Sequence, residues 1–160
     1  MSPADYFRPE LTVAAVAERY DRLLMIEELV QGRAVLNQPA GHVEPGETLT
    51  QAVARESLEE AGWVFVPKFI TGIYLWTDAD AGRSFLRVVF TGQLASHLPD
   101  RKLDAGILRT LWLSRDDVAA HPERLRNPMV LRSIDDYLQG HRLPVDLDER
   151  DGLVERAALL

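Results

Sequence analysis

The segment that most constrains this chain is its strongest helix-forming stretch, Leu49 to Ala61. It contains no Gly or Pro and is rich in Ala, Glu and Leu, and the following Gly62 is a residue that commonly ends helices. One side of this helix is small or apolar, and we expect it to pack on a sheet. The residues on that side are Val53, Ala54, Ser57, Leu58 and Ala61.

The other side of the predicted helix is strongly acidic. At about 100° per residue, Glu56, Glu59 and Glu60 share an arc of about 100°. Carboxylates this close repel one another, so they are found either on a solvated face or around a hard cation such as Mg²⁺. Two neighbours favour the cation site. Arg55 lies four residues before Glu59, and Glu47 lies close enough in sequence to reach Arg55 or a metal-bound water.

The rest of the chain favours a mixture of strands and short helices. We predict a hairpin from 11–17 and 22–26, a short strand at 34–36, a strand pair at 69–76 and 85–94, and a last strand at 110–113. Thr48 and Ser114 are predicted N-cap residues, and a further helix is predicted over 129–138. No assignment is made for 146–160.

Composition limits the classes of protein. The 160 residues, 46% of them hydrophobic, suit one domain with a single core. The absence of Cys excludes thiol chemistry, and the net charge of −7 argues against nucleic-acid binding. With neither a signal-like N-terminus nor a membrane-spanning apolar run, we expect a cytoplasmic protein, either a monomer or a homodimer.

The acidic helix and the loop before it, GHVEPGETLTQAVARESLEEAGW at 41–63, resemble the Nudix box. The pattern's specified glycine and polar positions are all filled, and Trp63 fills its last apolar position. At about 7% per residue type, seven such matches arise by chance on the order of 10⁻⁸ per starting position. The filled positions are Gly41, Glu47, Arg55, Glu56, Glu59, Glu60 and Gly62.

One position departs from the pattern. Ser57 stands where the family has an apolar residue on the sheet-facing side of the helix. We expect its hydroxyl to bond back to the carbonyl of Val53, which would make the change inexpensive. No carboxylate is missing, so the departure concerns packing.

The resemblance implies an α+β Nudix fold, a mixed β-sheet between α-helices, as a single domain. The order of the predicted elements agrees with this fold over about 8–140. It implies Mg²⁺, with Mn²⁺ as an alternative, held by Glu56, Glu60, Glu59 and the Gly41 carbonyl. Catalytic roles are implied for Glu56, Arg55 and Glu47. Glu56 is the favoured general base, with Asp100 and Asp104 as other candidates.

Further stretches, at 23–44, 84–90 and 127–144, resemble one branch of bacterial Nudix phosphatases. That resemblance implies release of phosphate from nucleoside tri- and diphosphates, and action on hydroxymethylpyrimidine pyrophosphate. The alternative is a Nudix pyrophosphohydrolase acting on an oxidised nucleotide, ADP-ribose or a dinucleoside polyphosphate. A catalytically silent ligand sensor is disfavoured, because the box carboxylates are complete.

Candidate substrate contacts lie outside the helix. Arg33 and Arg87 are candidates for binding phosphates, and Asn127 for contacting a base edge, although each also fits an ordinary structural role. His42 is a further phosphate-contact candidate. The aromatic candidates for stacking on a base, which fit a place in the core equally, are Tyr74, Trp76 and Phe85.

Overall fold

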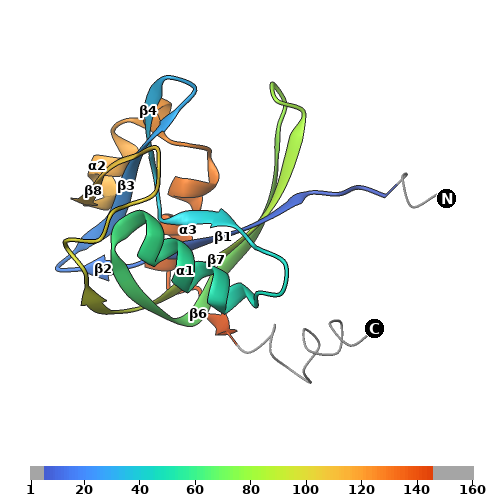
Figure 1. The fold of residues 1–160 in the computed structure, drawn as a ribbon. Helices are drawn as coiled ribbons and strands as arrows, with labels where there is room; N and C mark the ends of the chain where they lie inside the picture. The colour runs from blue at the N-terminus through green and yellow to red at the C-terminus, as the bar shows by residue number, and fades with distance from the viewer. Residues whose placement is uncertain (1–5, 146–160) are drawn as a thin grey trace.

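The computed structural model describes residues 6–145, and Figure 1 shows the arrangement of its elements. The predicted N-caps are present: the Thr48 and Ser114 side chains accept hydrogen bonds from the backbone N–H groups of Gln51 and Asp117. The helices are α1 (Leu49–Ala61), α2 (Arg115–Ala119) and α3 (Met129–Leu138), with a 3₁₀ turn at Pro122–Arg124. The strands are β1 (Glu10–Val16), β2 (Glu18–Arg19), β3 (Arg22–Val30), β4 (Arg33–Asn37), β5 (Ala40–His42), β6 (Trp63–Asp78), β7 (Arg83–His97), β8 (Ile107–Leu113) and β9 (Leu143–Pro144).

The strands form two sheets. The larger has the order β5-β1-β7-β6-β9 and is mixed, because β1 runs parallel to β7 while its other pairs are antiparallel. The smaller contains β2, β3 and β4, with β8 paired to the other edge of β3. Figure 1 also shows that the β6–β7 hairpin extends well beyond the helices.

The predicted hairpin of 11–17 with 22–26 is wrong in its first strand. The strand that forms the hairpin with β3 is the two-residue β2, across a tight turn in which Tyr20 and Asp21 both have positive φ. β1 instead lies inside the larger sheet, between β5 and β7. The physical reason is burial: Val13 to Val16 are at most 1% exposed, so this strand needs protein on both faces.

Helices cover opposite faces of the larger sheet, which confirms the predicted mixed sheet between helices. Val13 and Ala15 of β1 belong to one core cluster, together with Val53 of α1. The alternate residues Ala14 and Val16 belong to a second cluster, together with Ile134 of α3. The two-residue period of the strand therefore sends successive side chains into two cores.

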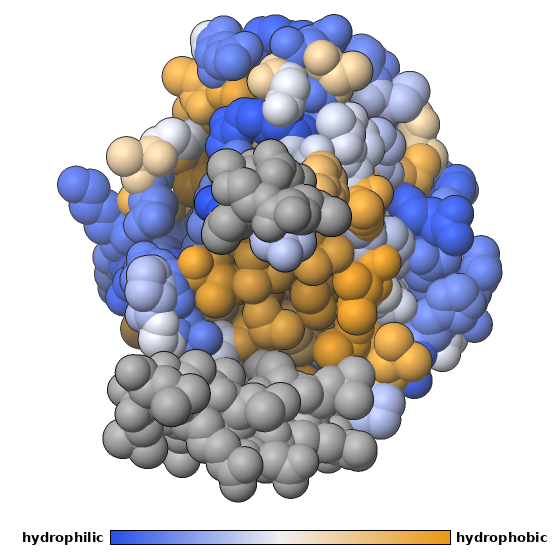
Figure 2. Space-filling model, turned by 90° about the vertical axis from the view of Figure 1, so that its right-hand side faces the viewer, coloured by the Kyte–Doolittle hydropathy of each residue, from blue (hydrophilic) through white to orange (hydrophobic). Residues whose placement is uncertain are grey.

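Strands β6 and β7 are longer than predicted. The pairing of β6 with β7 continues past Pro67 towards the helix through register shifts, one of them between Pro67 and Phe69. The neighbouring strands β1, β7 and β6 carry three leucines in register, Leu11, Leu86 and Leu75. Leu11 and Leu75 are exposed. Figure 2, which views the molecule from the right-hand side of Figure 1, shows an apolar area on that face. Among residues 6–145, no helix is long and apolar enough to span a membrane.

The expected bond of the Ser57 hydroxyl is absent. Ser57 is fully buried, and its Oγ has no hydrogen-bond partner among the described residues. The other small or apolar residues buried on α1 are Ala52, Val53 and Ala61, which offer no side-chain acceptor. The Ser57 hydroxyl is therefore removed from water without gaining an acceptor among the described residues. The departure from the family pattern therefore carries an energetic cost.

We predict that Ser57→Ala stabilises the protein. Removing a buried hydroxyl without a partner eliminates its desolvation penalty, and the expected gain in the free energy of unfolding is about 1 kcal/mol. Urea denaturation followed by circular dichroism measures this difference. A loss of stability in Ser57→Ala would contradict the absence of a partner for Oγ.

Candidate metal centre and substrate cavity

The acidic side of α1 lies beside the edge strand β5. The helix begins at the Thr48 cap and ends at Gly62, whose φ of 69° is left-handed. Within it, Glu56 is 8% exposed, and Glu59 and Glu60 are partly buried. The backbone N–H of Ala40 donates to Glu60 Oε2 at 2.7 Å. The helix therefore presents its carboxylates to the loop that precedes it.

Arg55 connects this loop to the helix with all five of its N–H donors. Its Nε and Nη2 donate to the two carboxylate oxygens of Glu47, at 2.6 and 3.0 Å. Its Nη1 donates to Glu56 Oε1 and Glu59 Oε2, both at 2.9 Å, and Nη2 also donates to the His42 carbonyl at 3.0 Å. The expected contacts of Arg55 with Glu59 and Glu47 are both formed. These hydrogen bonds raise the pKa of Arg55 and lower the pKa of Glu47.

Gly41 lies directly against the Glu56 carboxylate. A Cβ at this position would overlap both Glu56 oxygens and the carbon between them. The backbone of Gly41 is not left-handed, so glycine is required here for the close approach of the carboxylate and not for its φ. The loop and the helix are thus fitted together at the acidic cluster.

Burial makes ionisation of two carboxyl groups at this site, Glu56 and Glu60, less favourable. It raises the pKa of Glu60 to about 8 and also raises the pKa of Glu56. The charge of Glu56 adds to the shift of Glu60, and the charge of Glu59 adds to the shift of Glu56. Asp104 contributes to both shifts, so it lies near these carboxylates. Asp100 is found in a separate depression with His97 and Arg101. The structure therefore brings one of the two alternative base candidates, Asp104, to the site.

The donor set fits a hard divalent cation. Glu56 and Glu60 each have one oxygen without a hydrogen bond to another described residue, and both line a cavity. Carboxylate oxygens are the ligands that Mg²⁺ and Mn²⁺ prefer. No set of three acidic or His ligands is already assembled within 6–145. One reason is that Glu59 is turned to Arg55 and is not among the residues lining the cavity.

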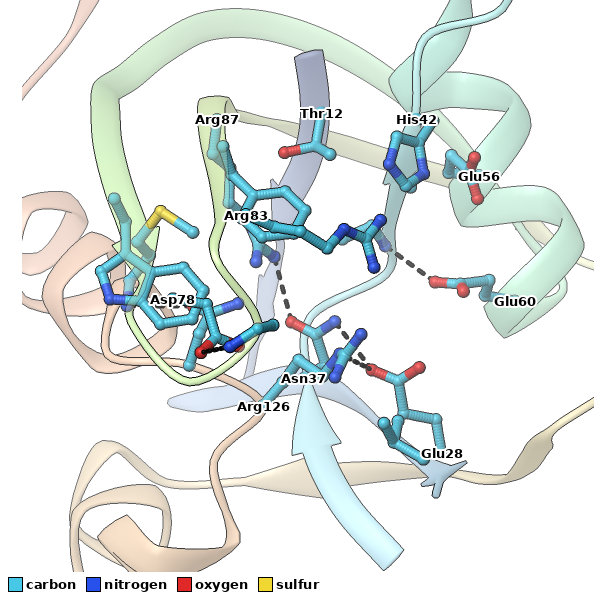
Figure 3. Close-up of a pocket in the computed structure, with 18 of the residues that line it drawn as sticks. Thr12, Glu28, Asn37, His42, Glu56, Glu60, Asp78, Arg83, Arg87 and Arg126 are labelled. Carbon is cyan, nitrogen blue, oxygen red and sulfur yellow. Dashed lines mark hydrogen bonds and ion pairs between the residues drawn. The ribbon is translucent and has the colours of Figure 1, made fainter. Parts of the chain in front are cut away.

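The cavity has a volume of about 450 Å³ and two chemically different sides. Glu56 and Glu60 border it from α1, while Arg83 and Arg87 border it from β7, as Figure 3 shows. Trp76 and Phe85, which also line it, stack with ring centroids 5.8 Å apart. The cavity can therefore hold a ligand with an anionic part and a flat ring.

The structure separates the predicted substrate contacts. Arg87, Asn127 and His42 line the cavity, as do the aromatic candidates Trp76 and Phe85. Arg33 does not: its exposed side chain donates to the Glu123 carbonyl at 3.4 Å. Tyr74 is also outside the cavity lining, and its hydroxyl donates to Asp136 at 2.7 Å.

Sequence reasoning missed the rim of the cavity. Glu10 accepts two hydrogen bonds of 2.6 Å from Arg83 and lies 2.7 Å from His42 Nε2. The contact with Arg83 lowers the pKa of Glu10 to about 2. Arg126 also lines the cavity, with its Nε 3.6 Å from Glu28. Glu10 and Arg83 are 73 positions apart, and no local pattern signals such a pair.

Comparison with known proteins decides the family, because the NUDIX domain model matches residues 8–133. The chain belongs to the Nudix hydrolase family. Phosphatase NudJ of Escherichia coli strain K12 is 36% identical over 141 residues, which cover 88% of this chain and 91% of NudJ. Enzymes of this family generally use divalent metal ions and act on small nucleotide substrates.

Solved structures agree with this assignment. A NUDIX hydrolase from Nitrosomonas europaea is 50% identical, with a TM-score of 0.86, over 88% of this chain and 95% of that one. A MutT NUDIX hydrolase from Burkholderia pseudomallei, at 20% identity, shares the fold with a TM-score of 0.69 over 81% and 98% of the two chains. The segment 41–63 of this Nudix hydrolase therefore lies in the same fold as in these solved Nudix structures.

We predict that Glu60→Gln stabilises the metal-free Nudix domain in a pH-dependent way. The pKa of Glu60 is about 8 in the folded state, against an ordinary value of 4.5. Ionisation therefore favours the unfolded state increasingly as pH rises from about 4.5 to 8. In EDTA, Glu60→Gln should raise the melting temperature by about 5 °C or more at pH 8 and little at pH 4.5.

Glu123→Gln serves as the matched control, because Glu123 is exposed and does not line the cavity. Differential scanning calorimetry at the two pH values compares the variants. An equal effect of Glu60→Gln at both pH values would show that the carboxyl is not held protonated by burial.

Proposed function

We propose that this Nudix hydrolase is a Mg²⁺-dependent nucleoside phosphatase that cleaves phosphoanhydride bonds of nucleoside tri- and diphosphates and releases orthophosphate. One observation carries the proposal: a single cavity joins the carboxylates of α1 to arginines of β7 and a stacked aromatic pair. Similarity to NudJ, which is named a phosphatase, supports the type of product. Hydroxymethylpyrimidine pyrophosphate is a further proposed substrate, since it also joins a flat ring to a diphosphate.

Glu56 and Glu60 would be the principal ligands of Mg²⁺ or Mn²⁺, because each lines the cavity and has a carboxylate oxygen without a hydrogen-bond partner in residues 6–145. The Gly41 carbonyl and Glu59 would complete the set, the latter after releasing Arg55. When bound, the cation offsets phosphate charge and lowers the pKa of a coordinated water. Arg55 and Glu47 would hold the loop and the helix in register.

Glu56 is the proposed general base. Arg55 holds one of its oxygens by a hydrogen bond, and the other oxygen, which would also bind the cation, would accept a proton from the attacking water with its second lone pair. Burial raises its pKa towards the range useful to a base near neutral pH. Asp104, which lies near both principal carboxylates, is the alternative base.

The distal part of the substrate would lie along β7. Arg87 is placed to donate to phosphate oxygens, and Trp76 with Phe85 to stack on the base. Asn127 would contact a base edge. Its Oδ1 already accepts from the Met129 N–H at 3.0 Å, so the amide group would supply its Nδ2 donor. Arg33 has no role in this proposal because it lies outside the cavity.

A substrate panel with Mg²⁺ tests the proposed activity. The panel contains GTP, GDP, ADP-ribose, a dinucleoside polyphosphate and hydroxymethylpyrimidine pyrophosphate, and products are separated by ion-exchange chromatography. We expect hydrolysis of GTP and GDP with orthophosphate as the primary product. Pyrophosphate and GMP from GTP, or a clear preference for ADP-ribose or the dinucleotide, would contradict the phosphatase proposal and favour the pyrophosphohydrolase alternative.

Glu56→Gln is the control that ties this activity to the acidic cluster. We expect turnover to fall by about 10²- to 10⁴-fold with the circular dichroism spectrum unchanged, because the proton acceptor and a metal ligand are lost. Glu123→Gln makes the same chemical change at an exposed site and should leave turnover unchanged. Near wild-type turnover in Glu56→Gln would remove Glu56 from its proposed roles.

A further inference from the structure

Two consecutive residues with buried amide side chains lie at the end of β4: Asn37 is its last residue, and Gln38 follows it. Asn37 is 5% exposed and Gln38 only 1% exposed, although both carry a polar group that needs hydrogen bonds when it leaves water. Both donate and accept within the protein, and both direct an oxygen to the same nitrogen, Nη2 of Arg87, at 3.0 and 3.1 Å. These two residues therefore hold one arginine, Arg87, by accepting hydrogen bonds from the same nitrogen.

The orientation of the Gln38 amide is fixed by helix α3. Its Nε2 donates to the Val130 carbonyl at 3.0 Å and to Ser133 Oγ at 2.9 Å. The Ser133 hydroxyl in turn donates to the same carbonyl at 3.1 Å, so it accepts from the amide. A backbone carbonyl can only accept, so the Gln38 oxygen has to face Arg87.

The Asn37 amide is fixed in the same sense from the smaller sheet. Its Nδ2 donates to Glu28 Oε1 at 3.0 Å, which leaves its oxygen for Arg87. A carboxylate thus stands behind the amide and does not contact the arginine. The two supporting residues offer Arg87 only neutral oxygen atoms.

Arg87 is consequently a buried cation without an ion pair. Its side chain is 3% exposed, and no carboxylate within residues 6–145 lies within 4.0 Å of it. Its Nε has no partner in this part of the chain, and Nη1 makes no hydrogen bond there either. Burial lowers its pKa to about 10. A desolvated, unpaired charge is costly unless an anion approaches it.

The other cavity arginines differ in this respect. Arg83 is held by both oxygens of Glu10, so its charge is largely compensated. Arg126 is 41% exposed and lies 3.6 Å from Glu28. Among the three, Arg87 is the one whose counter-charge is missing, and it borders the cavity that faces Glu56 and Glu60 (Figure 3).

We propose that Asn37 and Gln38 are positioning residues that keep Arg87 fixed and uncompensated, so that its Nη1 binds a phosphoryl oxygen of the substrate across the cavity from the acidic cluster. This inference rests on the proposed function and deepens it. A substrate would need one phosphate at the acidic side and another anionic oxygen at Arg87. Diphosphates and triphosphates should therefore bind much better than monophosphates.

Gln38→Glu tests the role of the neutral amide. The change preserves shape but places a carboxylate beside Arg87, which would compete with the substrate anion. Because a hydrogen bond to a charged group contributes about 1.5–3 kcal/mol, we expect KM for GDP to rise about tenfold or more. We expect kcat to change less than about threefold, because the acidic cluster is untouched. Gln93→Glu, which adds the same charge at an exposed position of β7, should alter neither constant.

Binding of inorganic pyrophosphate gives a readout that needs no turnover, so it is independent of the proposed activity. Calorimetric titrations should show a loss of affinity of about tenfold or more in Gln38→Glu and in Arg87→Met. Gln38→Glu should have no further effect in the Arg87→Met background, because it acts through Arg87. Equal binding by all variants, no binding by the unmodified protein, or additive losses in the double variant would overturn the proposal. Failure of the substrate panel with these losses intact would instead count against the proposed function alone.

Discussion

The geometry of the acidic cluster depends on one guanidinium group. Arg55 uses its whole set of N–H donors to join Glu47, the His42 carbonyl, Glu56 and Glu59. Without this cation, the glutamates of α1 would repel one another and the preceding loop would lose its attachment to the helix. The partial burial of the contacts strengthens them, because a lower local dielectric increases charge–charge attraction. Gly41 completes the arrangement by allowing the loop backbone to lie against Glu56.

The two sides of the cavity bury groups of opposite charge, carboxylates on α1 and a guanidinium on β7, and each burial is unfavourable. Burial raises the pKa of Glu56 and Glu60, so the acidic side is relieved by a cation. The β7 side holds Arg87 against neutral amides, so it is relieved by an anion. A metal-bound polyphosphate meets both needs at once. A chain with a net charge of −7 can in this way bind a polyanion at one place on its surface.

Much of this site is local in sequence, and local features were predictable. The bounds of α1, its Thr48 cap, its Gly62 stop and the contact of Arg55 with Glu59 all arise within a few residues of one another. The family resemblance rested on the same segment, and the NUDIX domain match confirms it. Helical geometry fixes neighbours three and four residues apart, so such contacts follow from spacing alone.

The features that sequence reasoning missed depend on long-range pairing. The partner of β1 is β7, more than 70 positions away, and a strand's pattern does not name its partner. Arg33 and Arg83 are both the first residue of a strand, yet only Arg83 lines the cavity. The expected bond of Ser57 failed because its hydroxyl finds no acceptor in the packed interface with the sheet.

The central claim is that Glu56 and Glu60, held by Arg55 and Gly41, bind a divalent cation. Anomalous diffraction from crystals soaked in millimolar Mn²⁺ tests it most directly, because the metal is located without reference to any substrate or rate. We expect a strong anomalous peak in contact with the Glu56 and Glu60 carboxylates. No peak at this cluster, or a sole peak elsewhere on the protein, would contradict it.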